Sequence, residues 1–196
     1  MYDSTNENVV TKSESPGKKS VVLTFDDGPS RLLPKFLDVL KQENVPAIFF
    51  WQTRLLHSKR PWQRVLDEGH IIGSHTVKHR NLVELTQEEQ YEDIKSSIAA
   101  IEQITGSNVR FFRPPYGQFN ADTLEVTDRL NVTPVMWKIA SMDWELKNDP
   151  EQLIANVAEN LEDGAVILLH ELPQTLEALP ALIAAIKERG YGFKLL

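Results

Sequence analysis

Hydrophobic residues in this chain of 196 residues are grouped in short continuous runs that alternate with longer amphipathic stretches. The short runs are rich in β-branched and aromatic residues, and continuous runs of this kind are typical of parallel strands buried on both faces. They predict strands at Ser20–Phe25, Ala47–Trp51, Ile71–Gly73, Val109–Phe112, Val135–Ile139, Ala165–Leu169 and Gly192–Leu195.

The longer stretches carry apolar residues three and four positions apart, which is the spacing of an amphipathic helix. The clearest is Thr86–Thr105, where Thr86 and Glu89 form a capping-box pattern and Gly106 is a plausible stop. The other predicted helices are Arg31–Glu43, Ala121–Leu130, Pro150–Leu161 and Leu176–Arg189.

This alternation predicts an α/β domain with a largely parallel sheet. Seven strands are few for a complete eight-stranded barrel, which usually takes about 250 residues. We therefore expect an incomplete (β/α) barrel of about seven mostly parallel strands, or an open sheet. The first eighteen residues are polar and lack the apolar run of a signal peptide. We interpret residues 1–18 as a disordered tail or linker, and residues 19–196 as the single folded domain.

Composition narrows the candidate functions. The formal net charge is -7 and there is no basic block, which argues against a nucleic-acid partner. No run approaches the roughly 20 apolar residues that a membrane span needs. The chain has no cysteine, so any metal must be bound by imidazole and carboxylate groups. The absence of cysteine is compatible both with the cytosol and with a bacterial exported protein.

Two adjacent carboxylates, Asp26 and Asp27, follow the first predicted strand, where active sites of α/β folds collect. Such a pair can divide the work, one residue binding a cation and the other taking a proton from water. The alternative is a simple turn at Gly28-Pro29 with an aspartate capping the next helix.

His75 and His79 have the spacing of two metal ligands on one helical turn. Thr76 stands where the zinc proteases carry a glutamate base, so Asp26 is the candidate base. Asp27 would then be the third ligand and leave a position open for water. Histidines at this spacing are also common as surface residues without a metal.

A third group follows the strand that ends at Phe112, in the sequence RPPYG at 113–117. Arg113 is a candidate partner for a carboxylate. The two prolines stiffen the loop, so the N–H of Tyr116 would point in a fixed direction, as an oxyanion site requires. A rigid structural turn with an exposed tyrosine is the alternative.

His170 ends another apolar strand, and Asp143 could orient it and raise its pKa so that it acts as a general acid. Trp144 and Leu168 would supply apolar walls for a small methyl group. A histidine at the end of a strand is more often a hydrogen-bonded core residue.

These residues form five motifs in a fixed order: TFDDGP at 24–29, HTVKH at 75–79, RPPYG at 113–117, DW at 143–144 and LLH at 168–170. With them the chain resembles the polysaccharide deacetylases of carbohydrate esterase family 4, which include peptidoglycan, chitin and nodulation-factor deacetylases. The resemblance covers Lys19 to Leu196. It implies a distorted (β/α) barrel of seven strands, in agreement with the strand pattern.

The resemblance also implies a role for each motif residue. It implies that Asp26 is the catalytic base and that the metal ligands are Asp27, His75 and His79. It implies that Arg113 holds the base in place and that the backbone of Tyr116 forms the oxyanion site. The last two motifs of the family match Asp143 with Trp144, and Leu168 with His170. One position departs from the family pattern: many members carry an acidic residue three positions before the aspartate of DW, and here that residue is Ala140.

We therefore expect a metal-dependent hydrolase that removes N-acetyl groups from N-acetylglucosamine units of a glycan such as peptidoglycan or chitin. Zinc is the expected metal, and cobalt or nickel would suit the same ligands. Three alternatives stay open: an acetylxylan esterase, a non-catalytic glycan-binding relative, and an α/β domain with a structural metal. We expect a monomer in the cell envelope or outside the cell, with a cytoplasmic protein as the alternative.

Overall fold

The structure, a computed structural model, describes residues 6, 8–14 and 19–196. Seven parallel strands follow one another in the order β5-β4-β3-β2-β1-β7-β6, and an eighth pairs with β1. The strands are β1 (Ser20–Gly28), β2 (Ala47–Trp51), β3 (Ile71–Ser74), β4 (Phe111–Phe112), β5 (Thr133–Pro134), β6 (Ile139–Ala140), β7 (Val166–His170) and β8 (Gly192–Phe193). The curled sheet confirms the predicted incomplete (β/α) barrel.

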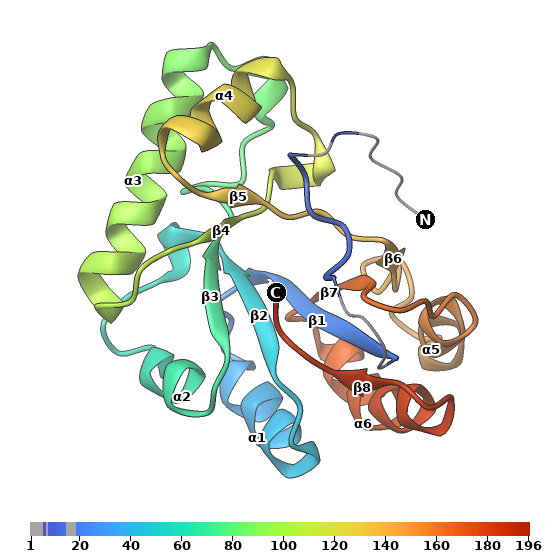
Figure 1. Cartoon of the computed structure of the whole chain (residues 1–196). Coiled ribbons are helices and arrows are strands. Elements are labelled where there is room, and N and C mark those ends of the chain that lie inside the picture. Colours follow the sequence, from blue (N-terminus) through green and yellow to red (C-terminus); the bar gives the residue numbers. More distant parts are fainter. Residues whose placement is uncertain (1–5, 7, 15–18) are drawn as a thin grey trace.

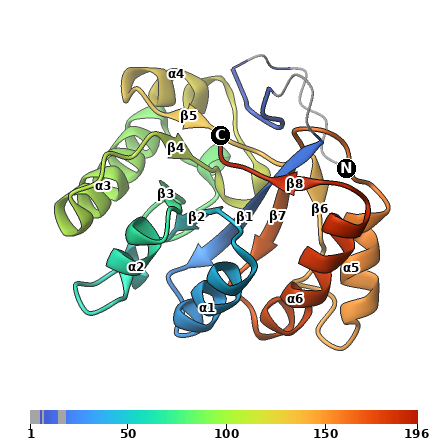
Figure 2. The ribbon, with the colours of Figure 1, turned by 60° about the horizontal axis from the view of Figure 1, so that its bottom comes forward.

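Helices cover the outer side of this sheet, as Figures 1 and 2 show from two directions. They are α1 (Leu33–Glu43), α2 (Trp62–Asp67), α3 (Gln87–Thr105), α4 (Ala121–Arg129), α5 (Pro150–Ala158) and α6 (Pro173–Glu188), with short 3₁₀ turns at Thr53–Leu55, Leu82–Glu84 and Pro115–Gly117. None of the helices in the described residues is both long and apolar enough to cross a bilayer.

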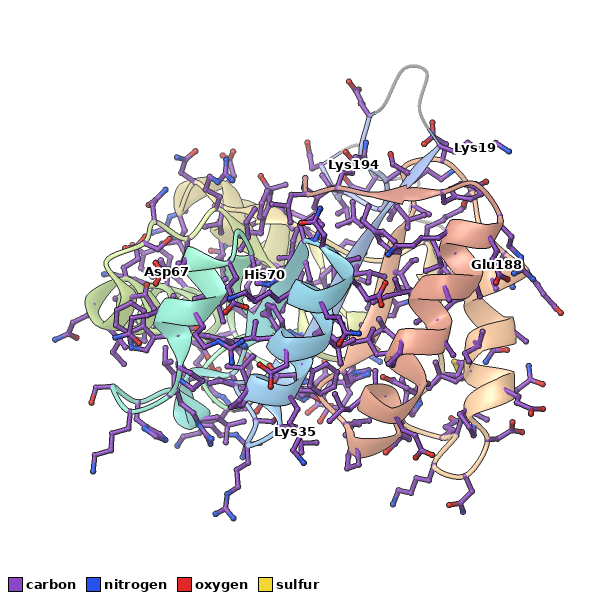
Figure 3. All side chains as sticks on the ribbon, turned by 90° about the horizontal axis from the view of Figure 1, so that it is seen from below. Lys19, Lys35, Asp67, His70, Glu188 and Lys194 are labelled. Carbon is purple, nitrogen blue, oxygen red and sulfur yellow. The ribbon has the colours of Figure 1, made fainter. Side chains whose placement is uncertain are left out.

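Alternate residues of each buried strand pack on opposite faces of the sheet. In β1, Leu23 and Phe25 belong to the large cluster that the helices cover. Val22 belongs instead to a smaller cluster with Phe50 and Val166, on the inner side of the curve. Because parallel strands all point the same way, their carboxyl ends form one rim. Figure 3 marks the two ends: Lys19, just before β1, lies opposite Lys35, in the first turn of α1.

The predicted capping box of α3 is present in both halves. The Thr86 hydroxyl accepts from the N–H of Glu89, and the Glu89 carboxylate accepts from the N–H of Thr86. The helix ends at Gly106, whose φ of 69° is left-handed, as expected of a glycine stop.

The structure differs from the predicted elements in several places. The single strand predicted at Val135–Ile139 is replaced by β5 and β6 on either side of residues 135–138. The carbonyl groups of Val135 and Met136 accept hydrogen bonds from the side chain of Arg113, at 3.0 Å each, which draws this backbone away from a regular ladder. The short helix α2 was not predicted, and α6 begins at Pro173, three residues before the predicted start.

Residues 8–14 pack against the barrel, unlike the disordered tail that we predicted for residues 1–18. The N–H of Val10 donates to Pro134 O at 2.9 Å, and Val10 O accepts from Met136 N at 2.8 Å. Thr11 O accepts from the N–H of Val166 at 3.1 Å. The segment thus connects β5 and β7 across the opening of the sheet. The rest of the predicted tail, residues 1–5, 7 and 15–18, lies outside the described residues.

Candidate active site

The polar residues singled out in the sequence meet at the carboxyl ends of the strands. They surround one cavity of about 410 Å³. The cavity is lined by Asp26, Asp27, His75, His79, Pro114, Tyr116, Gly117, Trp137, Trp144, Leu168, His170 and Leu172. Arg113 and Asp143 lie just beneath it, completely buried.

Asp27, His75 and His79 offer three ligand atoms within 4.8 Å of one another. Asp27 Oδ1 lies 3.5 Å from His79 Nε2 and 3.8 Å from His75 Nε2. A tetrahedral zinc ion holds nitrogen and oxygen ligands at about 2.0–2.2 Å, so the ligand atoms stand about 3.3 Å apart. The three side chains therefore fit a zinc-sized ion with little movement.

The tautomer of His75 is fixed by its second ring nitrogen. Nδ1 lies 2.7 Å from Arg113 O, and a carbonyl oxygen can only accept, so Nδ1 carries the proton. Nε2 then presents its lone pair toward Asp27. A hydrogen bond of this kind is the usual outer support of a metal-bound histidine.

The two histidines do not share a helical turn, and that part of the prediction is wrong. Residues 75–80 form an irregular loop after β3. Thr76 and His79 both adopt left-handed backbone angles, with φ of 66° and 58°, and the N–H of His79 donates to Thr76 Oγ1 at 2.9 Å. A tight turn, rather than a helix, brings the imidazole rings within 4.8 Å of each other.

The carboxylate of Asp27 is held in its charged form. Burial alone would raise the pKa of Asp27, but its electrostatic interactions with the protonated forms of His75, His170 and His79 outweigh burial and lower the pKa. Gln52 contributes as well, since its Nε2 donates to Asp27 Oδ1 at 2.6 Å. Gln52 was missed in the sequence, although its position directly after the buried strand β2 is a signal for a site residue.

Asp26 is also buried, and its two oxygens face different partners. Oδ1 accepts from Arg113 Nη1 at 2.8 Å, and Oδ2 lies 3.8 Å from His75 Nε2. Arg113 also donates to Thr24 Oγ1 at 2.7 Å and packs over the ring of Phe50 at 4.2 Å. Within the described residues, Asp26 is the only carboxylate paired with Arg113, in keeping with the alanine at position 140.

His170 faces the cavity with Asp143 behind it. His170 Nδ1 lies 2.7 Å from Asp143 Oδ1, and the Thr175 hydroxyl donates to Asp143 Oδ2 at 2.6 Å. Burial by itself lowers the pKa of His170. The hydrogen bond and charge of Asp143, with the charges of Asp26 and Asp27, outweigh burial and raise the pKa.

The walls of the cavity are apolar or aromatic. The Trp144 ring meets the His170 ring edge-on at 5.3 Å, and Tyr116 meets His79 in the same way at 4.5 Å. Tyr116 is 65% exposed, and its φ of 59° is left-handed. Trp137 completes the wall and was missed, because nothing in the sequence separates it from a core tryptophan.

Glu171 is a third missed residue. Its buried carboxylate accepts from the N–H of Ser30 at 2.8 Å and from Trp51 Nε1 at 3.1 Å. Burial raises the pKa of Glu171 in spite of these bonds. A Cβ at Gly28 would overlap this carboxylate, so the turn after Asp27 requires a glycine. Glu171 thereby fixes the loop that carries the acidic pair.

His70 does not belong to the site. Its Nδ1 accepts from the N–H of Ala47 at 3.1 Å, and burial lowers its pKa to about 4. His70 is therefore a neutral core residue.

A family model described as polysaccharide deacetylase matches residues 13–135 of the chain. The chain belongs to the polysaccharide deacetylase family. It is 36% identical to the putative polysaccharide deacetylase YheN of Bacillus subtilis, over 93% of this chain and 69% of that protein.

Two solved structures illustrate the range of this deacetylase family. The peptidoglycan N-acetylglucosamine deacetylase Bc1960 superposes with a TM-score of 0.87 and 33% identity, over 96% of this chain and 90% of that one. BA3943 of Bacillus anthracis, a CE4 family pseudoenzyme, superposes with a TM-score of 0.85 and 29% identity, over 94% of this chain and 66% of that one. The fold therefore serves both active and inactive members, and activity has to be argued from the site.

Proposed function

We propose that this protein is a metal-dependent hydrolase that removes acetyl groups from N-acetylglucosamine units of a glycan, of the peptidoglycan or chitin type. One observation carries the proposal. A buried carboxylate braced by an arginine, Asp26, and an imidazole of raised pKa, His170, face one cavity beside a cluster of Asp27, His75 and His79.

Zinc is the metal that we propose, held by Asp27, His75 and His79, and cobalt or nickel would suit the same donors. When bound, the metal would polarise the acetamide carbonyl and lower the pKa of a water molecule.

The protein's own groups supply the proton transfers and the binding surface. Asp26 takes the proton from the attacking water, held in position by Arg113. The N–H of Tyr116 donates to the oxygen that becomes negative. His170 then protonates the leaving amine, and acetate and a glucosamine unit result.

The acetyl methyl group would lie against the apolar part of the cavity. Leu168 is buried in the middle of β7, and Trp144 is partly exposed and lines the same cavity. We propose that these two side chains, predicted as pocket walls, select a small acyl group.

Two other functions use the same geometry. An acetylxylan esterase would cleave an ester with the same groups. A non-catalytic relative would need no acid or base, and the retained pairs Asp26–Arg113 and His170–Asp143 favour an enzyme. Because peptidoglycan is an envelope polymer, we also propose that the protein acts in the cell envelope or outside the cell.

The test is acetate release from peptidoglycan, chitin oligomers and acetylated xylan, with chelator and after adding Zn²⁺ back. Wild-type protein should release acetate from the first two, and chelator should abolish the release. Asp26→Asn should bind Zn²⁺ with near wild-type affinity, measured by chelator competition, and lose turnover by at least about 100-fold. Full acetate release by Asp26→Asn would refute the assignment of the base, and release from xylan alone would favour the esterase.

A further inference from the structure

Three loops beside the candidate metal ligands carry only positive charge. They follow β1, β2 and β3 and comprise residues 29–32, 52–61 and 76–81. The chain has 28 acidic and 21 basic residues, yet these loops contain no Asp or Glu. Their cations, which we call the cationic rim, are Arg31, Arg54, Lys59, Arg60, Lys78 and Arg80.

Backbone and side-chain contacts hold the three loops together. The N–H of Arg54 donates to Val77 O at 3.1 Å, which places Arg54 next to the loop of Lys78. Arg60 Nη1 donates to Ser30 O at 3.3 Å, which places the second loop against the first. The rim is therefore one surface rather than three separate loops.

Most of this charge is not neutralised by the protein. Within the described residues, only Arg80 of the rim forms a salt bridge, with Asp93 at 3.0 Å. The side chains of Arg31, Lys59 and Lys78 are exposed and have no carboxylate within 4.0 Å in that part of the chain. Their charges are free to act on a bound molecule.

Arg54 connects the rim to the catalytic cavity. Its Nε donates to Gln52 Oε1 at 2.8 Å, and Gln52 Nε2 donates to Asp27 Oδ1 at 2.6 Å. The guanidinium of Arg54 is thus two hydrogen bonds from a candidate metal ligand. An anionic group beside the reacting sugar would come within reach of the rim.

The opposite side of the cavity has the reverse charge. The exposed charged residues of the loop at 141–149 are Glu145 and Asp149 against one cation, Lys147, because Asp143 is buried and paired with His170. The charge therefore changes sign across the site, although the chain as a whole is acidic at -7. Such an arrangement orients a charged ligand and attracts it from solution.

We propose that the cationic rim binds carboxylate groups of an anionic glycan, so that the enzyme prefers acetamido sugars flanked by carboxylates over neutral oligomers. The inference rests on the proposed function. The carboxylates could belong to an acidic ether substituent on the sugar or to a peptide attached to it, since both present the same chemistry to Arg and Lys.

The test compares two triple variants with the same change in net charge. The rim variant is Arg31→Gln with Lys59→Gln and Lys78→Gln. Within the described residues, no salt bridge joins these three side chains to a residue of the cavity. The control is Lys19→Gln with Lys41→Gln and Arg189→Gln. These residues lie before β1 and at the ends of α1 and α6, on the side of the barrel away from the cationic rim. For wild type and both variants, kcat/KM is measured on four substrates. They are a neutral N-acetylglucosamine oligomer, a sugar dimer with an ether carboxylate, the same dimer with a peptide attached, and the peptide-bearing dimer with its carboxylates amidated.

The rim variant should lose about tenfold in kcat/KM on the carboxylated substrates, which is about 1.4 kcal/mol shared among three exposed ion pairs. Its activity on the neutral and amidated substrates should equal that of wild type, and the control should match wild type throughout. Added salt should weaken the wild-type preference. In the Asp26→Asn background, which prevents turnover, the rim substitutions should lower the affinity for the carboxylated dimers by the same factor, measured by calorimetry.

The outcomes separate this inference from the proposed function. If wild-type protein releases acetate equally from neutral and carboxylated substrates at low salt, the rim has no role in recognition and the inference is wrong. If it releases acetate from none of them, the proposed function is wrong. The substrate on which the rim variant loses kcat/KM, with the ether carboxylate or with the peptide, identifies the group that the rim binds.

Discussion

At the scale of single residues, the pair of His170 and Asp143 decides the pH dependence of the proposed reaction. The general acid must be protonated when the amine leaves, and Asp143 keeps it so by raising the pKa of His170 against the effect of burial. In Asp143→Asn the negative charge is lost while burial remains. The pKa of His170 should then fall, and the alkaline limb of the kcat profile should move to lower pH.

We expect kcat of Asp143→Asn to drop by about 100-fold or more at neutral pH, as for loss of a general acid. The measurement is acetate release over pH 5 to 10. Thr175→Val is the matched control: it removes one hydrogen bond to Asp143 Oδ2 and leaves the charge, so the limb should stay near its wild-type position. An unshifted limb in Asp143→Asn would mean that Asp143 only positions the ring.

Sequence analysis identified the site residues whose side-chain chemistry and position at a strand end can both be read from the local sequence. Asp26, Asp27 and His170 stand at the carboxyl ends of apolar strands, and that position is a property of the local pattern. Gln52 and Glu171 were missed because their roles depend on partners far along the chain. Glu171, for example, accepts from Ser30, 141 positions away.

At the scale of elements, α3 fixes the loop that carries the candidate metal ligands. Asp93 lies in the first half of this helix, and its buried carboxylate accepts from the N–H of Val77 at 2.8 Å and from Arg80 at 3.0 and 3.1 Å. Both partners lie in the loop between His75 and Asn81. The helix thus fixes the backbone from which both imidazoles project.

Asp93→Ala should therefore weaken metal binding without abolishing it. Outer partners of metal ligands are typically responsible for 10- to 100-fold in affinity, and we expect about tenfold here, measured by chelator competition for Zn²⁺. Glu92→Ala removes the same charge from the adjacent exposed position of α3 and should bind Zn²⁺ as wild type does. Equal affinities in the two variants would show that the loop keeps its shape without the helix.

Elements with a complete local signal were predicted almost to the residue. The predicted helix at 86–105 has its cap, its apolar stripe and its glycine stop within one stretch, and α3 begins and ends there. The strand predicted at 135–139 is wrong because its apolar pattern is regular, while its backbone carbonyl groups accept hydrogen bonds from a buried guanidinium, that of Arg113 after β4. That contact is tertiary, so no local pattern encodes it.

At the scale of the whole molecule, the incomplete barrel has an opening between its edge strands β5 and β6, and the N-terminal segment covers part of it. Val9 is buried, and Val10 packs against the inner cluster that contains Val22 and Val166. Leu195 and Leu196 at the other end of the chain pack against the same cluster. Both ends of the described chain therefore complete the core of a sheet that does not close on itself.

Removal of residues 1–14 should destabilise the whole domain, because the inner cluster and the edge of β5 would be exposed to water. Burial of a valine side chain contributes about 1.5–3 kcal/mol, and only part of this is recovered in a segment that must also be ordered. We expect a loss of about 2 kcal/mol, which lowers Tm by about 4–8 °C in a domain of this size. Removal of residues 1–5 alone retains Val9, Val10 and their hydrogen bonds, and should leave Tm unchanged in the same thermal unfolding experiment followed by circular dichroism. If both truncated proteins have the same Tm as the full chain, the segment lies on the barrel without stabilising it, and the sheet is stable with its edges exposed.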